Sequence, residues 1–189
     1  QGSYSELAMG WAGLFVDHDN DGTLDLFTTQ GDWWHLPADR EPFPVQLLRF
    51  DGSGFVDAST ETGLTAEGSF RGAVSRDFNG DGVLDFLVSS VFDHHKLFLS
   101  EGCTQNTWLS VTAPQGARIQ VSAGDSVWTD WAKANSSFGA HARPLAHFGL
   151  GQLETVDRIE VVLPGGELFE IDGPINTRRQ VQISPPVAR

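Results

Sequence analysis

Short runs of alternating apolar and polar residues, separated by turns that contain glycine, cover most of the chain. Alternation with a period of two is typical of strands that bury one face, and apolar stripes with the period of a helix are hard to find. In the C-terminal part we expect strands at residues 107–113, 117–123, 126–132, 158–164, 167–171 and 179–183. Six or seven short strands of this kind predict a small β-sandwich, which we place at residues 106–189.

The N-terminal part, residues 1–105, contains an internal repeat. The segment GLFVDHDNDGTLDLFTT at residues 13–29 returns sixty residues later as AVSRDFNGDGVLDFLVS at residues 73–89. In each copy the apolar residues after the acidic core predict a strand, and further strands follow it. The strands expected here cover residues 25–29, 46–50 and 55–58 after the first core, and 84–90 and 96–100 after the second.

Each copy carries an oxygen-rich loop with the pattern Asp-x-(Asp/Asn)-x-Asp-Gly-x-Leu-Asp. Side chains at positions 1, 3, 5 and 9 and the main-chain carbonyl of position 7 converge when the chain curls around the position-6 glycine. An all-oxygen cluster suits Ca²⁺, and the lack of imidazole and thiolate in the pattern disfavours zinc and copper. The predicted ligands of two Ca²⁺ ions are Asp17, Asp19, Asp21, Thr23 and Asp25 in the first loop, and Asp77, Asn79, Asp81, Val83 and Asp85 in the second.

Neither loop is an EF-hand, because Thr28 and Val88 stand at position 12 in place of the bidentate glutamate. We therefore expect a Kd of ~10⁻⁴ M, in the range of extracellular modules. The alternative is that both segments are solvated acidic turns, since Asp-Gly and Asn-Gly favour turns without an ion. Two copies in register favour the metal site.

The acidic loops, the hairpin LRFDGSGF at residues 48–55 and the sequence TGL at residues 62–64 resemble the FG-GAP/VCBS repeats of calcium-binding β-propellers. The bacterial relatives of cartilage acidic protein are the most similar members. The resemblance implies propeller-type blades with the ion loop between two strands of one blade. A closed propeller needs at least four blades, so two blades leave sheet edges open. We expect that other chains or the C-terminal part cover these edges, or that the chain is a piece of a longer propeller.

The C-terminal part resembles the ASPIC/UnbV domain that follows VCBS-type repeats in the same bacterial proteins. The matching segments are NTWL at 106–109, GARI at 116–119, HFGLG at 147–151 and LPGG at 163–166. The family usually has Trp-Pro-Ser-Gly at the last of these segments, so Leu163 and Gly165 depart from it. Together the two resemblances imply an all-β chain, with two propeller-type blades that carry calcium loops followed by a small β-sandwich.

The negative charge is concentrated in the repeat part. Residues 1–105 hold 17 acidic and 5 basic residues, whereas residues 106–189 hold 8 and 7. A polyanion repels nucleic acid and anionic membranes, which excludes nucleic-acid binding as a function. No apolar run approaches the roughly 20 residues of a membrane-spanning helix. We expect a secreted, periplasmic or cell-surface protein.

Trp33, Trp34 and His35 lie in a long connection with polar flanks, and we regard them as candidates for contact with a protein or glycan partner. The alternative is that the two indoles cap an open blade edge or fill the seam between two blades. Adjacent His94 and His95 point to opposite faces if they lie on a strand, so a shared metal ion is not expected there. Cys103 is the single cysteine, and no activating base accompanies it in the sequence.

These observations favour a non-catalytic calcium-binding module for adhesion or assembly, whose partners include further copies of the chain. A repeating subunit of an extracellular fibre is one form of this hypothesis. A different class stays open because the UnbV name is attached to natural-product biosynthesis, so the resemblance permits a part in a cyclisation enzyme. No nucleophile motif, P-loop or acid–base constellation in the sequence supports that alternative.

Overall fold

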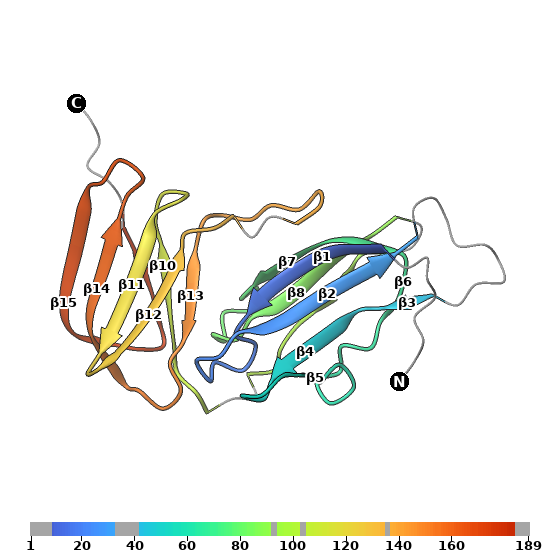
Figure 1. Ribbon diagram of the computed structural model, residues 1–189, viewed down its shortest axis with the longest axis horizontal. Coiled ribbons are helices and arrows are strands. Elements are labelled where there is room, and N and C mark those ends of the chain that lie inside the picture. The colour runs from blue at the N-terminus through green and yellow to red at the C-terminus, as the bar shows by residue number, and fades with distance from the viewer. Residues whose placement is uncertain (1–8, 33–41, 92–93, 103–104, 135–136, 184–189) are drawn as a thin grey trace.

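A computed structural model of the protein describes residues 9–32, 42–91, 94–102, 105–134 and 137–183 (Figure 1). Within these residues the predicted all-β class is confirmed, because they form sixteen strands and no helix. The strands of the described residues form five sheets, and none of these sheets closes into a barrel or propeller. Two parts lie side by side along the long axis, residues 9–98 in one and 108–182 in the other. None of the described segments is a helix long and apolar enough to span a membrane.

The first repeat forms an antiparallel sheet of four strands, which in spatial order are β1 (Met9–Val16), β2 (Asp25–Gly31), β4 (Gln46–Phe50) and β5 (Phe55–Asp57). The three strands expected after the acidic core are thereby confirmed. The fourth, β1, precedes the acidic loop and pairs with β2 from Met9↔Gly31 to Val16↔Asp25. The loop therefore connects two paired strands of one sheet.

The second repeat forms the same arrangement with one strand fewer among the described residues. Its sheet consists of β7 (Phe70–Arg76), β8 (Asp85–Ser90) and β9 (Lys96–Phe98). The pair Arg76↔Asp85 closes its acidic loop as Val16↔Asp25 closes the first. A small ladder of β3 (Phe43–Pro44) and β6 (Glu67–Gly68) lies in the connection between the repeats.

The two repeat sheets share one apolar core. Phe27 of β2 and Phe86 of β8 are buried and stack with ring centroids 4.3 Å apart. Strands β1 and β2 both lie against β7, so the sheets pack face to face. The outer face of the second sheet stays apolar as well, because Leu87 pairs with Leu97 across β8 and β9 and both side chains are exposed.

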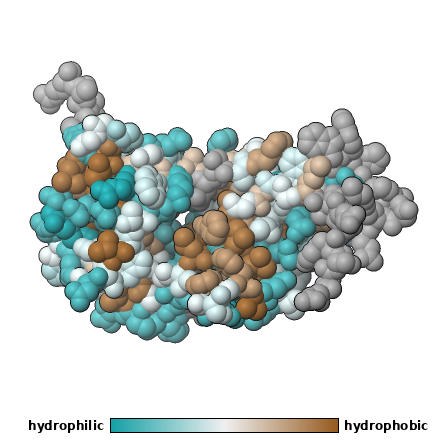
Figure 2. Space-filling view, in the orientation of Figure 1, coloured by the Kyte–Doolittle hydropathy of each residue, from teal (hydrophilic) through white to brown (hydrophobic). Residues whose placement is uncertain are grey.

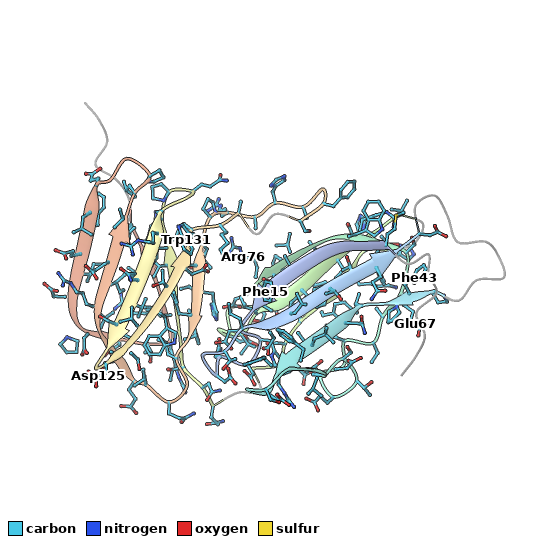
Figure 3. All side chains as sticks on the ribbon, in the orientation of Figure 1. Phe15, Phe43, Glu67, Arg76, Asp125 and Trp131 are labelled. Atoms are coloured by element: carbon cyan, nitrogen blue, oxygen red, sulfur yellow. The ribbon has the colours of Figure 1, made fainter. Side chains whose placement is uncertain are left out.

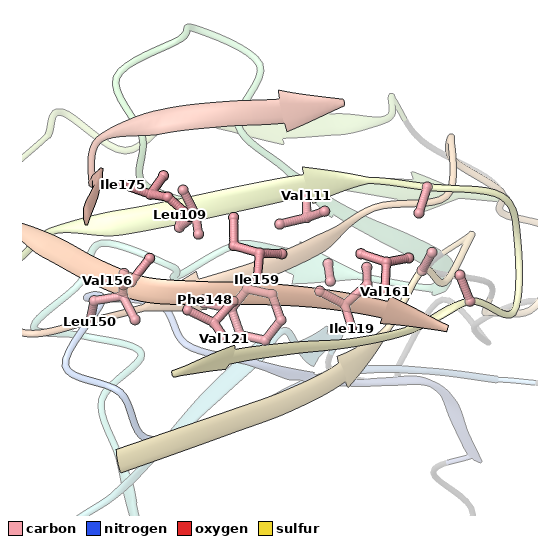
Figure 4. Close-up of a cluster of buried hydrophobic side chains, with 14 residues drawn as sticks. Leu109, Val111, Ile119, Val121, Phe148, Leu150, Val156, Ile159, Val161 and Ile175 are labelled. Atoms are coloured by element: carbon pink, nitrogen blue, oxygen red, sulfur yellow. The ribbon is translucent and has the colours of Figure 1, made fainter. Parts of the chain in front are cut away.

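The C-terminal part packs two sheets around a second core (Figure 4). In spatial order one sheet holds β13 (Ala146–Gly149), β10 (Trp108–Thr112) and β16 (Arg179–Gln182), and the other holds β12 (Ser126–Trp131), β11 (Arg118–Ala123), β14 (Thr155–Val162) and β15 (Leu168–Asn176). Leu109, Ile119 and Ile159 are fully buried between them. Two facing sheets fit the predicted β-sandwich, and all six strands expected in this part are present.

The sequence pattern did not predict β13, and its residues entered the sequence analysis only through the HFGLG segment. In the structure residues 146–149 pair with β10, and the turn begins only after Gly149. The apolar residues of this strand are buried while His147 faces the repeat part. A strand of four residues with glycine at its end carries too little alternation to be recognised from the pattern alone.

Candidate metal loops and the junction they form

The two acidic loops fold in the same way. In each, the position-1 carboxylate accepts a hydrogen bond from the N–H of the position-6 glycine, Gly22 to Asp17 at 2.8 Å and Gly82 to Asp77 at 2.9 Å. The position-3 side chain accepts from the N–H of position 5, and the position-5 carboxylate accepts from the N–H of position 7. The repeat in sequence is therefore a repeat in hydrogen bonding.

The backbone at positions 4 and 6 takes left-handed conformations in both loops. Position 6 is glycine in each, with φ of 93° at Gly22 and 89° at Gly82. Position 4 is Gly80 in the second loop, with φ of 82°, and Asn20 in the first, with φ of 60°. Asparagine is among the few residues with a side chain that enter this region readily. Asn20 thus adopts the left-handed conformation that Gly80 adopts in the other copy.

The position-9 aspartates are buried and join each loop to its sheet. Asp25 Oδ1 accepts the N–H of Phe50 at the end of β4, at 2.9 Å. Asp85 Oδ1 accepts the N–H of Ser100, which follows β9, at 2.6 Å. The second oxygen of each carboxylate accepts the N–H of position 2 in its own loop, from His18 and Phe78. These carboxylates support the loops through hydrogen bonds, whether or not an ion binds.

The first loop brings together three of its predicted ligands. Carboxylate oxygens of Asp17, Asp19 and Asp21 lie within 4.8 Å of one another. Burial, with a smaller contribution from the negative charges of Asp21, Asp19 and Asp25, raises the pKa of Asp17 to about 7 against the lowering effect of the Gly22 N–H. Three crowded carboxylates, one of them buried, are repulsive unless a cation or protons neutralise them. This donor set fits a hard cation with oxygen ligands.

The second loop is arranged differently at its centre. The amide nitrogen of Asn79 donates to Asp81 Oδ2 at 2.9 Å, and it also donates to the carbonyl of Ser100. Its three aspartates form no cluster of the kind seen in the first loop, within the residues that the structure describes. An amide in place of the position-3 carboxylate lowers the negative charge, so we expect a cation to bind the second loop more weakly than the first.

His18 contacts the first loop in a way that sequence reasoning missed. Its Nδ1 lies 2.5 Å from Asp25 Oδ2. Burial opposes a charge on the ring, but the hydrogen bond to Asp25 and the charges of Asp25, Asp19 and Asp17 outweigh it and raise the pKa of His18. Position 2 of the pattern is Phe78 in the second copy, so the repeat gave no signal for a polar contact there.

The loops also dock on the C-terminal part, and Asn20 is the centre of that contact. Its side-chain amide donates to the carbonyl of Gly82 in the second loop at 3.0 Å, and its Oδ1 lies 2.7 Å from Nε2 of His147 on β13. Its own carbonyl accepts the N–H of Gly151 at 2.9 Å. Asn20 is fully buried. One side chain therefore connects both loops to the C-terminal part.

Glycines allow the loops to approach that part closely. A Cβ on Gly82 would lie 1.7 Å from the indole nitrogen of Trp108, and one on Gly149 would lie 2.0 Å from Asp17 Oδ2. Both distances are far below van der Waals contact, so neither position accepts a side chain without movement. The HFGLG segment, singled out in the sequence for its family resemblance, thus carries a glycine that contacts the first candidate ligand.

A third contact comes from the connection between β12 and β13, which reaches over the repeat part in Figure 1. The hydroxyl of Ser137 accepts the N–H of Ala73 on β7 and donates to its carbonyl, both at 2.8 Å. The ring of Phe138 packs edge-on against Trp11 of β1, with centroids 5.0 Å apart. The two parts are therefore fastened at the loops and along β1 and β7.

Some candidates cannot be placed. Trp33, Trp34 and His35 lie outside the described residues, as does Cys103. Of the adjacent histidines, His95 accepts a hydrogen bond from the N–H of Ser90 through Nδ1. The prediction of a partner-binding tryptophan loop stays a prediction.

Comparison with known families matches both parts of the chain. The FG-GAP-like repeat family matches residues 17–88, a range that begins at the first candidate ligand and includes both loops. The family described as ASPIC and UnbV matches residues 110–189. The chain is an FG-GAP repeat protein with an ASPIC/UnbV domain. The C-terminal two-sheet part is accordingly called the ASPIC/UnbV domain below.

Curated relatives with this combination are known in vertebrates. The chain is 29% identical to cartilage acidic protein 1 of Homo sapiens over 177 residues, which cover 82% of this chain and 25% of that protein. It is 26% identical to cartilage acidic protein 1 of Xenopus tropicalis over 193 residues, with 87% of this chain and 27% of that protein covered. The chain thus spans about a quarter of the length of these relatives.

Proposed function

We propose that the chain is an extracellular, non-catalytic protein-interaction module whose acidic loops bind Ca²⁺ and thereby hold the repeats against the ASPIC/UnbV domain. The observation that carries the proposal is the cluster of Asp17, Asp19 and Asp21, whose oxygens lie within 4.8 Å of one another beside the domain contact. In each loop four side chains and one main-chain carbonyl, that of Thr23 or Val83, would supply the oxygen ligands of one ion.

The ion would act on stability through the junction. Asp17 lies against Gly149, and Asn20 three residues later contacts both Gly82 and His147. A cation that neutralises the cluster keeps this loop in its curled conformation, and the curl is what presents Asn20 to its partners. With a Kd of ~10⁻⁴ M and millimolar calcium, each site adds about 1.4 kcal/mol to the free energy of unfolding.

The proposed interaction role rests on open sheets. FG-GAP repeats are typically protein-interaction modules, and we interpret the two repeat sheets as propeller-type blades. The exposed pair of Leu87 and Leu97 gives the outer face of the second sheet an apolar surface. A further blade, a protein partner or a second copy of the chain would bury it. Weak calcium sites fit an extracellular, periplasmic or surface location, where calcium reaches millimolar levels.

The enzymatic alternative has less chemical support in the described residues. His147, which contacts Asn20 across the domain junction, has both ring nitrogens in hydrogen bonds, to Ser110 and Asn20. A ring held in this way is poorly placed to take a proton from a substrate. The part in a cyclisation enzyme therefore ranks second.

Thermal unfolding in calcium, in magnesium and with a chelator tests the proposal. Two occupied sites are expected to raise the melting temperature by about 5–10 °C in millimolar calcium relative to the chelator. The variant Asp21→Asn, which changes an exposed ligand of the first loop, is expected to lose about half of this shift. Asp125→Asn, a carboxylate-to-amide change in an exposed turn of the ASPIC/UnbV domain, is the matched control and keeps the full shift.

Sedimentation of the same samples measures the oligomeric state and so tests whether the chain self-associates. A chelator that changes neither melting nor sedimentation would contradict the calcium role. A compact monomer under all conditions would contradict self-association and leave a different protein or a glycan as the partner.

A further inference from the structure

A cleft of about 300 Å³ lies between the repeats and the ASPIC/UnbV domain. Its repeat side includes Phe15 and Leu24, and its domain side includes Val127 and Trp128. Phe15, Leu24 and Val127 are each more than half exposed, although they are large apolar residues. Figure 2 shows apolar residues gathered on this face, over the ends of β1 and β2 next to the junction. The walls thus offer apolar surface to a small molecule. The volume of the cleft lies at the lower end of the range of ligand pockets.

The inner wall carries a partly buried arginine whose terminal nitrogens have no hydrogen-bond partner in the described part of the chain. Arg76, the last residue of β7, lines the cleft, and Figure 3 places its side chain in the junction between the two parts. Its Nη1 and Nη2 atoms are buried and make no hydrogen bond within the described residues. A guanidinium that has lost water and gained no acceptor carries a large desolvation cost. Buried arginines are normally paired, so this one calls for an anionic partner.

The carboxylates that share the cleft are already engaged. Asp17 accepts hydrogen bonds from the N–H groups of Asp21 and Gly22. Asp130 forms an ion pair with Lys133, with 2.6 Å between Oδ1 and Nζ. His147 also lines the cleft, and burial together with the charge of Arg76 lowers the pKa of its ring, so the histidine is neutral and Arg76 is the cation beside it.

We propose that the cleft binds a small organic carboxylate that carries a flat apolar group, with the carboxylate on Arg76 and the apolar group between Phe15, Leu24 and Trp128. The fork of N–H donors on a guanidinium matches the two oxygens of a carboxylate. The apolar walls select against inorganic phosphate or sulfate, which have no surface to bury there. The cleft borders the first calcium loop through Asp17 and Leu24, but the proposed site takes an anion on Arg76 instead of a cation on carboxylates.

An NMR titration of the full chain in calcium-replete buffer tests this site. The probe is 3-phenylpropionate, and the matched control is its neutral amide, 3-phenylpropionamide. The indole N–H resonance of Trp128, assigned with Trp128→Phe, reports on the cleft. The carboxylate is expected to bind with a Kd on the order of 1 mM, as its size allows, and the amide about tenfold more weakly. Equal binding of the two probes, or no saturable shift at Trp128, would overturn the proposal.

Two sets of variants test whether Arg76 binds the carboxylate of the ligand. Arg76→Gln keeps a polar side chain of similar shape and is expected to weaken carboxylate binding about tenfold, with amide binding unchanged. Val127 on the exposed rim allows a test that leaves Arg76 intact: Val127→Glu is expected to weaken carboxylate binding and Val127→Lys to preserve or strengthen it. If both variants at Val127 bind alike, or if Arg76→Gln binds the carboxylate as the wild type does, the proposed site is wrong.

Discussion

At the residue scale, the hydrogen bonds of His147 fix its protonation. The amide nitrogen of Asn20 donates to Gly82, so its Oδ1 faces His147 and must accept from Nε2. The ring proton therefore lies on Nε2, and Nδ1 accepts from the hydroxyl of Ser110 at 2.9 Å. Burial and then the positive charge of Arg76 lower the pKa of His147 to about 4. The neutral ring is a structural part of the domain junction.

This pKa predicts a loss of stability in mild acid. The unfolded histidine titrates near 6.5 and the folded one near 4, so between these values the unfolded chain binds a proton that the folded chain does not. The contribution of His147 is complete above pH 6.5 and is lost as the pH falls to 4, by up to about 3 kcal/mol. Urea unfolding of the wild type and His147→Gln at pH 7 and pH 4.5 measures it. The variant is expected to depend less on pH, and parallel curves would contradict the assignment.

At the element scale, the loop between two paired strands is the unit that recurs. Each loop is fixed internally by the hydrogen bonds of positions 1, 3 and 5, and externally by the position-9 aspartate. The second loop then meets Trp108 through Gly82, whereas its other left-handed glycine, Gly80, has open space around it. Gly80 is therefore needed only for the backbone conformation of the loop. Gly82 is needed both for that conformation and for the close contact with Trp108 of the ASPIC/UnbV domain.

Alanine at these two glycines is expected to give different results. Gly80→Ala strains a left-handed backbone and costs about 1 kcal/mol of unfolding free energy. Gly82→Ala carries the same strain and also collides with the Trp108 indole, so it is expected to cost at least about 3 kcal/mol. Urea unfolding of both variants measures the difference. Equal losses would show that the second loop does not depend on contact with Trp108.

The loops were predictable from the sequence because their pattern is local and occurs twice. The same holds for the strands with clear alternation, such as residues 118–123. The contacts between the parts were not predictable. Asn20 stands at a position that the loop pattern leaves free, and Arg76 lies just before the second loop with nothing in the sequence to mark it as unpaired. Their roles depend on residues more than 50 positions away, Gly82, His147 and Val127.

At the scale of the whole molecule, the acidic loops lie where the repeats meet the ASPIC/UnbV domain. The negative charge of the chain is concentrated in the repeats, and the buried Asp17 belongs to the same cluster that contacts Gly149. A cation at this point would stabilise the loop and the domain contact together. The chain spans about a quarter of its curated relatives, and the apolar outer face of β8 and β9 is the surface on which a further part or partner would pack.

Calorimetric titration of the chelator-treated chain with calcium tests most directly whether the duplicated loops are metal sites. Two ions per chain are expected, with Kd values of ~10⁻⁴ M and the tighter one in the first loop. Asp21→Asn is expected to remove the tighter site, and the double variant Asp21→Asn with Asp81→Asn to remove both, while Asp125→Asn binds two ions. No heat of binding at millimolar calcium, or two ions still bound by the double variant, would contradict the calcium-loop assignment.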